Sequence, residues 1–322
     1  MACPVTVRNS RLLSRAALAC LCAASVLFSS TTATSAGEQQ SATAESEDAA
    51  VRVMTFNIRY NNRRDGENAW PNRKDIVAGI IRDNKTDIVG LQEALPEQVR
   101  DLETRLDEFA WYGVGRNDAK VENNNSGETC SIFYRKDRFE RLDAGTFWLA
   151  QDPNKVGNKS WDAALPRICS WVKLQDARSG GIVFAFNTHF DHVGEEARQE
   201  SAKLLVREIP RIAGEHAFVL TGDFNADPNS EPYAVLSGKK QADDEEPTAF
   251  RDAVKISEQT PNGPDSTWNG FREVVPGRRI DYVFLPSGRG SVRSLATLDQ
   301  TYEGRFPSDH LPVIAEVMFA ND

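Results

Sequence analysis

The spacing of apolar residues along the chain predicts strands that alternate with amphipathic helices over its first half. Two short apolar runs, 51–58 and 88–91, have the length of buried strands. Between them, apolar residues recur with helical spacing over 72–82, at Ile76, Val77, Ile80 and Ile81. Pro96 suits the first turn of a second helix, whose apolar side carries Val99, Leu102 and Leu106.

Strands predominate in the second half of the chain. We expect them over 130–135, 168–174, 182–188, 218–220, 280–285 and 312–319, with one long helix over 195–212. Strands that first interleave with helices and then predominate are typical of an α/β or α+β domain with more than one sheet. No change of composition marks a linker after Val51, so we expect one domain over 51–322.

The N-terminal segment has the order of a secretory signal peptide. Three arginines precede an apolar run over 16–28, and small residues follow up to Ala36. We therefore expect a signal peptide over 1–36, a disordered polar linker over 37–50, and a mature chain that is secreted or periplasmic. An uncleaved N-terminal anchor is the alternative, but the run is short for a membrane span, and no other stretch approaches one.

Removal of that segment changes the formal net charge from −9 to −12, because it contains three arginines and no acidic residue. Tight nonspecific binding of duplex DNA depends on basic residues that neutralise phosphates. We therefore expect no stable binding of duplex DNA. We expect a monomer whose substrate is a phosphorylated small molecule, a lipid or an oligonucleotide.

Two of the five cysteines, Cys130 and Cys169, lie outside the predicted signal peptide. In an oxidising compartment they could form a disulfide. They could equally remain free thiols that are buried in neighbouring strands. Their positions do not have the spacing of a zinc site.

Polar residues stand at the ends of several predicted strands, where a rigid sheet can hold a site. These residues are Asn57, Glu93, His189, Asp191, Asp223, Asn225, Asp281, Asp309 and His310. Carboxylates and amides suit Mg²⁺, with Mn²⁺ as the alternative, whereas zinc hydrolases favour more histidine or cysteine ligands. The chain has only four histidines. The pattern therefore predicts a site for a hard divalent cation.

Six short motifs resemble, in their order, those of the endonuclease/exonuclease/phosphatase superfamily. They are Asn57, Leu91-Gln92-Glu93, Asn187-Thr188-His189, Gly222-Asp223-Phe224-Asn225, Ile280-Asp281-Tyr282 and Ser308-Asp309-His310. The resemblance covers 51–319. It implies the deoxyribonuclease I-like fold, a four-layer sandwich in which two mixed sheets pack face to face with helices outside. The segment 222–236 is most similar to deadenylases of the nocturnin type, and 65–74 and 191–194 look like a branch of small exported members.

The resemblance implies roles for the groups around the attacking water. Glu93 would be the principal metal ligand, with Asn57 and Asp309 near the metal or its waters. His310 would be the general base or an electrostatic partner of the water, oriented by Asp281.

It also implies roles for the groups around the phosphate. Asp223 would position or activate the nucleophile, and Asn225 would bind phosphoryl oxygens. His189 would donate a hydrogen bond to the phosphate or assist the leaving group.

In the small exported branch, the resemblance implies a substrate pocket. Its members would be Trp70, Arg73, Arg167, Asp191, Trp268 and Phe271. Arg167 could bind phosphate through its bidentate guanidinium, or it could form a surface ion pair. The aromatic residues could stack on a base or a sugar, or they could anchor small clusters beneath loops.

These features predict an exported, divalent-metal-dependent phosphoester hydrolase in which water attacks phosphorus in line. A phosphodiesterase and a phosphatase are both open, and the expected substrate is a small or medium organic phosphate or a lipid head group. An extracellular nuclease is the alternative. A noncatalytic binding protein on the same fold would need a broken position in the motifs, and all of them are intact.

Overall fold

The computed structural model describes residues 50–239 and 250–320, and the described residues belong to one compact unit. The predicted signal peptide over 1–36 and nearly all of the predicted linker over 37–50 lie outside the described residues. Within the described ranges, no helix is long and apolar enough to cross a membrane. Two sheets of six strands each form the centre of the unit.

The first sheet combines strands from the beginning and the end of this unit. Its strands are β1 (Val51–Asn57), β2 (Ile88–Ala94), β3 (Phe109–Tyr112), β4 (Thr129–Arg135), β11 (Ser291–Thr297) and β12 (Val313–Met318). Their order in the sheet is β11-β12-β1-β2-β4-β3. The central strand β1 pairs in parallel with β2 and antiparallel with β12, so the sheet is mixed.

The second sheet takes the middle of the chain. Its strands are β5 (Phe139–Trp148), β6 (Ile168–Asp176), β7 (Ile182–His189), β8 (Ala217–Asp223), β9 (Phe250–Asp252) and β10 (Asp281–Pro286). Their order is β5-β6-β7-β8-β10-β9. The central pair β7 and β8 is parallel, and β8 pairs antiparallel with β10.

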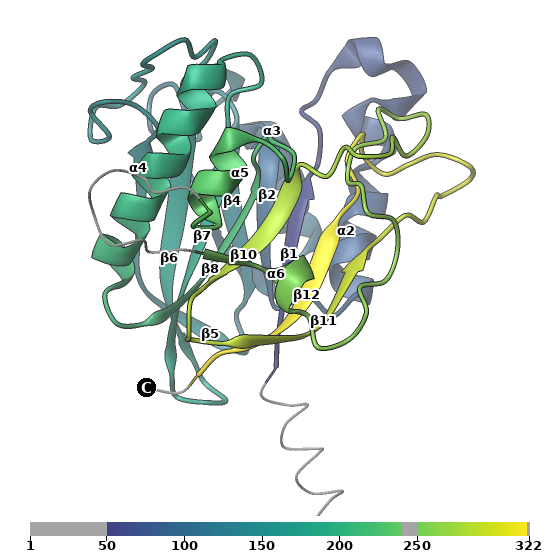
Figure 1. Cartoon of the computed structure of the whole chain (residues 1–322). Helices are drawn as coiled ribbons and strands as arrows, with labels where there is room; N and C mark the ends of the chain where they lie inside the picture. The colour runs from purple at the N-terminus through teal and green to yellow at the C-terminus, as the bar shows by residue number, and fades with distance from the viewer. Residues whose placement is uncertain (1–49, 240–249, 321–322) are drawn as a thin grey trace, which may run out of the picture. The chain divides into compact units, whose positions relative to one another are not determined.

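Helices cover the outer face of each sheet, as Figure 1 shows. The α-helices are α2 (Lys74–Asp83), α3 (Pro96–Arg105), α4 (Glu195–Ala213), α5 (Glu231–Leu236) and α6 (Ala253–Ile256), and the 3₁₀ helices are η1 (Arg63–Asn68), η2 (Trp70–Asn72) and η3 (Asn124–Ser126). The apolar side of α2 and α3 packs on β1 and β2 of the first sheet. The apolar side of α4 and α5 packs on β7 and β8 of the second. The predicted four-layer sandwich is therefore confirmed.

The space between the two sheets changes from apolar to polar along the central strands. Side chains alternate between the two faces of a strand, so every second residue faces the other sheet. In β1 these residues are Val51, Val53, Thr55 and Asn57. The same change runs along β7 through Val183, Ala185, Asn187 and His189, and along β8 through Val219, Thr221 and Asp223. The apolar half forms the inner core, and the polar half ends in the predicted site.

A buried layer of hydrogen bonds supports this polar end. The Gln92 amide donates to Asn187 Oδ1 at 2.7 Å and to Thr55 Oγ1 at 3.1 Å, and it therefore ties the two sheets together. Thr221 Oγ1 donates to the same Asn187 oxygen at 3.1 Å. A Cβ atom on Gly90 would lie 2.6 Å from Asn187 Oδ1, so only glycine lets the sheets approach this closely.

Cys130 and Cys169 are free and buried. Cys130 lies on β4 of the first sheet and Cys169 on β6 of the second. Burial raises the pKa of the Cys130 thiol to about 12. Of the two alternatives left by the sequence, the structure has the free thiols.

Every strand and helix that the apolar spacing predicts is present, with its ends shifted by a few residues. Four further strands, β3, β5, β9 and β11, were not predicted, and the short helices α5 and α6 were not predicted either. All four missed strands lie at the edges of the two sheets.

Candidate active site

Three neighbouring strands of the second sheet place a histidine and two aspartates in one row. In the pairing register, His189 of β7 lies opposite Asp223 of β8, and Asp223 lies opposite Asp281 of β10. All three side chains are buried. Because the register is set by backbone hydrogen bonds in the centre of the sheet, the row has little freedom to change its spacing.

His310 reaches this row from the segment before β12. Its Nδ1 lies 2.8 Å from Asp281 Oδ2, and its Nε2 lies 3.7 Å from Asp223 Oδ2. Burial alone would lower the pKa of His310, but the carboxylates of Asp281 and Asp223 raise it well above the ordinary value. The ring is therefore a cation at neutral pH, and Asp281 fixes its orientation.

The first sheet contributes an amide and a carboxylate. Asn57 Nδ2 donates to Asp223 Oδ2 at 2.9 Å and to Glu93 Oε1 at 3.2 Å, so a single side chain links the two sheets at the site. The backbone N–H of Tyr60 donates to the other Glu93 oxygen at 3.0 Å. Burial, together with the nearby Asp281 carboxylate, raises the pKa of Asp223 to about 7.

The carboxylates of Glu93 and Asp309 fit a divalent cation. Arg59 approaches both, but at 3.9 Å from Glu93 Oε2 and 3.8 Å from Asp309 Oδ2, so hydrogen bonds to Arg59 do not use up these oxygens. Burial raises the pKa of Asp309, which a cation beside it would oppose. With the Asn57 amide, these groups form the oxygen-rich donor set that Mg²⁺ and Mn²⁺ prefer.

A second set of possible ligands consists of Asp223, Asp281 and His310, whose ligand atoms lie within 4.8 Å of one another. These side chains already bond to one another and to Asn57, through the Asp281–His310 contact at 2.8 Å and the Asn57–Asp223 hydrogen bond at 2.9 Å. The Glu93 set is therefore the better match for a cation, and the second set is the better match for proton transfer.

His189 connects this row to the other end of the site. Asn225 Nδ2 lies 3.1 Å from its Nε2, and Asp223 Oδ2 lies 3.4 Å from the same nitrogen. Burial and the positive charge of Arg167 lower the pKa of His189 well below its ordinary value, so the ring is neutral. If Asn225 donates to Nε2, the proton is on Nδ1, which lies 3.9 Å from Glu128 Oε2.

Backbone strain is concentrated around these groups. Arg59, Glu93 and Asn225 have φ values of 55°, 63° and 45°, in the left-handed region that residues with a side chain rarely occupy. Such conformations persist where the surrounding structure holds them, and they are common at functional sites. Here they turn the chain sharply just after β1, at the end of β2 and just after β8.

The site opens into a cleft of about 470 Å³. Of the predicted site residues, the cleft is lined by Glu93, Arg167, His189, Asp223, Asn225, Trp268, Asp309 and His310. Glu93 and His310 thus border one cleft although they lie far apart in the chain. Asn57 and Asp281 support it from behind through their bonds to Asp223, Glu93 and His310.

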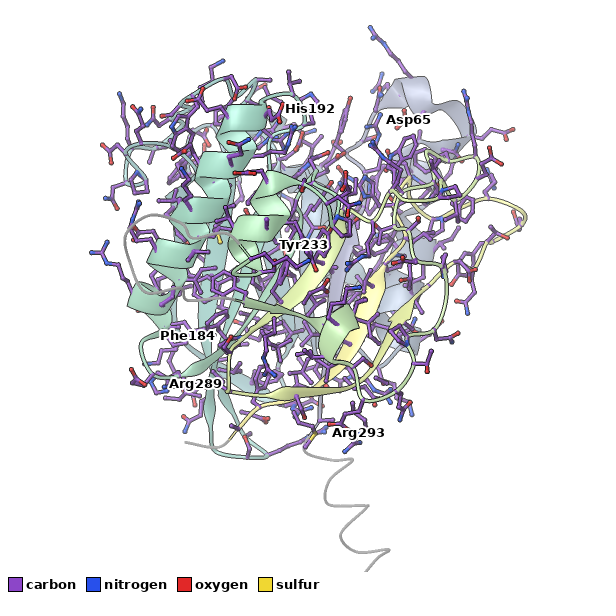
Figure 2. The ribbon with its side chains drawn as sticks, in the orientation of Figure 1. Asp65, Phe184, His192, Tyr233, Arg289 and Arg293 are labelled. Atoms are coloured by element: carbon purple, nitrogen blue, oxygen red, sulfur yellow. The ribbon has the colours of Figure 1, made fainter. Side chains whose placement is uncertain are left out.

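Six further residues line the cleft that sequence reasoning did not assign to it. They are Arg59, Tyr60, Arg116, Glu128, Leu165 and His192. Arg59, Tyr60 and His192 stood close to a motif in the sequence, and Arg116 and Glu128 come from the loop between β3 and β4. In Figure 2, His192 lies at the same end of the unit as Asp65, the ion-pair partner of Arg59, and Arg289 and Arg293 lie at the opposite end.

Arg167 borders the cleft and is only 5% exposed, so the ion pair that it forms with Asp191 is a buried one and not a surface one. Its Nε lies 3.4 Å from Asp191 Oδ2, and its Nη2 lies 2.9 Å from His192 Nδ1. Asp191 is 1% exposed and does not line the cleft. The prediction that Asp191 contacts substrate is therefore corrected, because its carboxylate instead positions Arg167.

The structure also corrects the predictions for Trp70 and Arg73. Trp70 is buried in the outer core of the first sheet, and its indole N–H donates to Asp101 at 2.9 Å. Arg73 is buried and donates to the carbonyl oxygens of Ile58 and Pro307, at 2.8 and 2.7 Å. Both side chains hold the chain around the site together and do not line the cleft.

The two remaining aromatic residues differ from each other. Trp268 lines the cleft, and its backbone pairs with His310 in an isolated bridge. Phe271 does not line the cleft, and its predicted contact with substrate stays a prediction. Its ring lies beneath the guanidinium of Arg73, 5.2 Å from centroid to carbon, and anchors that side chain.

Asp191 leads to a prediction about stability in acid. Burial alone would raise its pKa, but hydrogen bonds from the backbone N–H groups of Gly194 and Val193 lower it to about 2, from 3.8. A lowered pKa stabilises the folded state above the unfolded pKa, and this contribution is lost as the pH falls toward 2. We expect Asp191→Asn to lower the free energy of unfolding at pH 7 by about 2 kcal/mol.

Urea unfolding of both proteins between pH 2 and pH 7 measures this effect. The difference between wild type and Asp191→Asn should shrink as the pH falls from 4 to 2, whereas the exposed Asp299→Asn should differ little from wild type throughout. A difference that stays constant down to pH 2 would contradict the assignment of the stabilisation to the charge.

Two six-stranded sheets that meet at a cleft of carboxylates and imidazoles define a protein of the deoxyribonuclease I-like sandwich class. The model of the endonuclease/exonuclease/phosphatase family matches residues 54–310. The chain belongs to the endonuclease/exonuclease/phosphatase family. Its members act as hydrolases on phosphate esters, and the relatives below include a phosphatase.

Solved structures of bacterial members are similar over most of the chain. A family protein from Bacteroides vulgatus is 41% identical with a TM-score of 0.77, and the match covers 84% of this chain and 99% of that one. A mannosyl-6-phosphatase from Bacteroides thetaiotaomicron is 32% identical with a TM-score of 0.75, over 84% of this chain and all of the other. Nocturnin from Drosophila melanogaster is 24% identical, and the match covers 77% of this chain but only 42% of the length of that nocturnin.

Proposed function

We propose that this protein is an exported phosphatase that uses a divalent cation, Mg²⁺ or Mn²⁺, to hydrolyse the phosphate ester of a small organic molecule. The observation that carries the proposal is the convergence of Glu93, Asp223 and His310 on one cleft of about 470 Å³. A cleft of this volume suits a small ligand. The acidic chain is a poor partner for duplex DNA, and the similar mannosyl-6-phosphatase favours a monoester over a diester.

Glu93, Asn57 and Asp309 would hold the cation. When bound, it would supply positive charge against the phosphoryl oxygens and would make a coordinated water more acidic. Without it, the positive charge nearest to both carboxylates in the cleft is that of Arg59, at 3.9 and 3.8 Å.

Asp223 is the group best placed to take the proton of the attacking water. It lies at the centre of the row, between His189 and Asp281, and Asn57 holds one of its oxygens at 2.9 Å. His310 presents Nε2 on the same side, 3.7 Å from Asp223. Its positive charge, fixed by Asp281, would stabilise the negative charge that develops as the water attacks.

The far side of the cleft would hold the phosphate and the leaving group. Asn225 and Arg167 would donate hydrogen bonds to phosphoryl oxygens, and the planar guanidinium of Arg167 is held rigidly by Asp191. The neutral His189 would orient the ester oxygen that departs. In-line attack by water then needs no covalent intermediate. The bond from phosphorus to the ester oxygen breaks as the bond to the water oxygen forms, the departing oxygen takes up a proton to replace the one that Asp223 accepts, and inorganic phosphate and an alcohol are the products.

Hydrolysis of 4-nitrophenyl phosphate and of bis(4-nitrophenyl) phosphate by the purified protein tests this proposal. We expect the monoester to be cleaved in Mg²⁺ or Mn²⁺, the reaction to stop with a chelator, and activity to return when the metal is restored. DNA, RNA and sphingomyelin serve as competing substrates. Preferred cleavage of one of these, or a folded and metal-loaded protein that cleaves no phosphate ester, would overturn the proposal.

Export rests on the order of residues 1–36 and is tested separately. The protein expressed with its own N-terminus should appear outside the cytoplasm and should begin near residue 37, as N-terminal sequencing would show. Retention of the intact N-terminus in a membrane fraction would instead support the uncleaved anchor.

A further inference from the structure

Beyond His189, the cleft contains a group of charged residues, of which the proposed mechanism uses Arg167 and its partner Asp191. We call this group the arginine pocket, and it consists of Arg116, Glu128, Arg167, Asp191 and His192. These residues come from the loop between β3 and β4, from the segment before β6, and from the segment before α4. Four of them line the cleft, and Asp191 lies behind Arg167.

Glu128 is the centre of the arginine pocket. Arg116 Nη1 donates to Glu128 Oε2 at 2.6 Å, and Arg167 Nη1 lies 3.9 Å from the same oxygen. His189 Nδ1 also lies 3.9 Å from it. One edge of His189 therefore faces the catalytic row and the other faces Glu128, so the arginine pocket begins where the leaving group would depart.

Three buried nitrogen atoms around Glu128 have no hydrogen-bond partner among the described residues. They are Arg116 Nε, Arg167 Nη1 and His189 Nδ1. Arg116, Arg167 and His189 are each more than nine-tenths buried. A buried donor without an acceptor destabilises the protein, so three of them around one carboxylate indicate a place for a ligand with acceptor oxygens.

These side chains border the main cleft and a second cavity of about 10 Å³. The second cavity has room for one water at most. A ligand larger than a water must therefore approach these side chains from the main cleft, which Arg116, Arg167 and His189 also line. On its wall, Trp268 and Tyr60 supply aromatic rings near the catalytic row.

The charges of the arginine pocket select the kind of ligand. The two guanidinium groups are matched by two carboxylates, Glu128 and Asp191. A second phosphate would meet the Glu128 carboxylate and be repelled. A hydroxyl group, in contrast, can donate to Glu128 while it accepts from Arg116, Arg167 or His189.

We propose that the arginine pocket binds the hydroxyl groups of the leaving group, so that the preferred substrate is the phosphate monoester of a carbohydrate. This inference rests on the proposed phosphatase function and adds the substrate class to it. Recognition through several hydroxyl groups would pair all three unpartnered donors at once. The aromatic rings of the cleft would cover the apolar face of the sugar ring.

The test compares a hexose 6-phosphate with 4-nitrophenyl phosphate, whose leaving group has no hydroxyl groups to engage the pocket. We expect Glu128→Ala to lower kcat/KM for the hexose phosphate about 30-fold, as for the loss of hydrogen bonds to a charged group. For 4-nitrophenyl phosphate we expect a change below about 3-fold. Glu122→Ala, an exposed position on the same loop, is the matched control and should change neither value.

Each outcome bears on the inference in a different way. An equal loss for both substrates would mean that Glu128 acts in catalysis or in folding, which overturns the inference. Wild-type protein that cleaves 4-nitrophenyl phosphate but not sugar phosphates would also overturn it, and the proposed phosphatase function would stand. Preference for a sugar bisphosphate would show a second anion in the pocket and would contradict the charge argument. Failure with every phosphate ester would end both proposals.

A second variant separates the pocket from general damage to the fold. Glu128→Gln keeps the shape and one acceptor oxygen but removes the charge. It should recover part of the activity on the hexose phosphate, with an unchanged thermal unfolding midpoint. No recovery in a variant that is as stable as wild type would count against hydroxyl recognition.

Discussion

Replacement of His310 by alanine should lower kcat/KM for a phosphate monoester about 10³-fold, which corresponds to about 4 kcal/mol of transition-state stabilisation. The reason is the position of the ring. Asp281 holds Nδ1 at 2.8 Å, and Nε2 faces the Asp223 carboxylate at which the proposed mechanism takes up a proton. Steady-state kinetics on 4-nitrophenyl phosphate at saturating metal measure the effect.

Asp281→Asn provides the matched partner of that experiment. It keeps the size of the side chain but removes the charge that orients His310, so we expect a smaller loss, on the order of 10²-fold. Because both residues act through the same imidazole, the double variant should be little worse than His310→Ala alone. Losses that multiply fully would show that Asp281 has a role independent of His310.

Glu93→Gln should weaken the binding of Mg²⁺ at least about 100-fold, because it removes a charged oxygen ligand from the proposed donor set. The substitution should affect metal binding and leave the local backbone in place. The glutamine oxygen can still accept from the backbone N–H of Tyr60, so the strained turn at this position keeps its support. Calorimetric titration of the metal-free protein with Mg²⁺ measures the affinity without reference to activity.

Glu97→Gln is the control for this titration, because Glu97 lies in the first turn of α3 and does not line the cleft. Its Mg²⁺ affinity should equal that of wild type. If Glu93→Gln binds Mg²⁺ as tightly as wild type while Asp223→Asn does not, the cation belongs to the set of Asp223, Asp281 and His310.

The strands that the sequence did not reveal share a physical feature. β3, β5, β9 and β11 are the four edges of the two sheets. An edge strand pairs on one side only and stays partly in water, so it does not need a continuous apolar run. In β5, the stretch 140–143 is exposed although it is paired with β6, and its mostly charged residues are also typical of a loop. The central strands are buried on both faces, and their apolar runs were visible.

The residues of the catalytic row were recognisable because each stands in a short motif at the end of such a run. Arg116 and Glu128 have no such marker. They come from a loop rich in asparagine and glycine, and their function depends on the neighbours that folding gives them, namely Arg167 and His189. A single sequence does not contain that proximity.

Trp70 and Arg73 show the opposite case. The resemblance of the segment 65–74 to small exported family members suggested that both contact substrate. The side chains of both turn inward, Trp70 to Asp101 and Arg73 to two backbone carbonyl groups. Tryptophan and arginine side chains are large and can form hydrogen bonds. They can therefore link buried segments of the chain as well as line a binding pocket.

The sequence by itself determined the central strands of both sheets, the polar groups at their ends and, through the resemblance, the four-layer fold. These follow from local pattern, because a buried strand needs apolar residues and a site needs polar ones at its end. Only the tertiary structure decided which polar groups share the cleft. The pairing registers that align His189, Asp223 and Asp281, and the hydrogen bond from Asn57 to Asp223 across the sheets, join residues up to 166 positions apart. Such contacts arise from how the sheets pack, which no local stretch of the chain encodes.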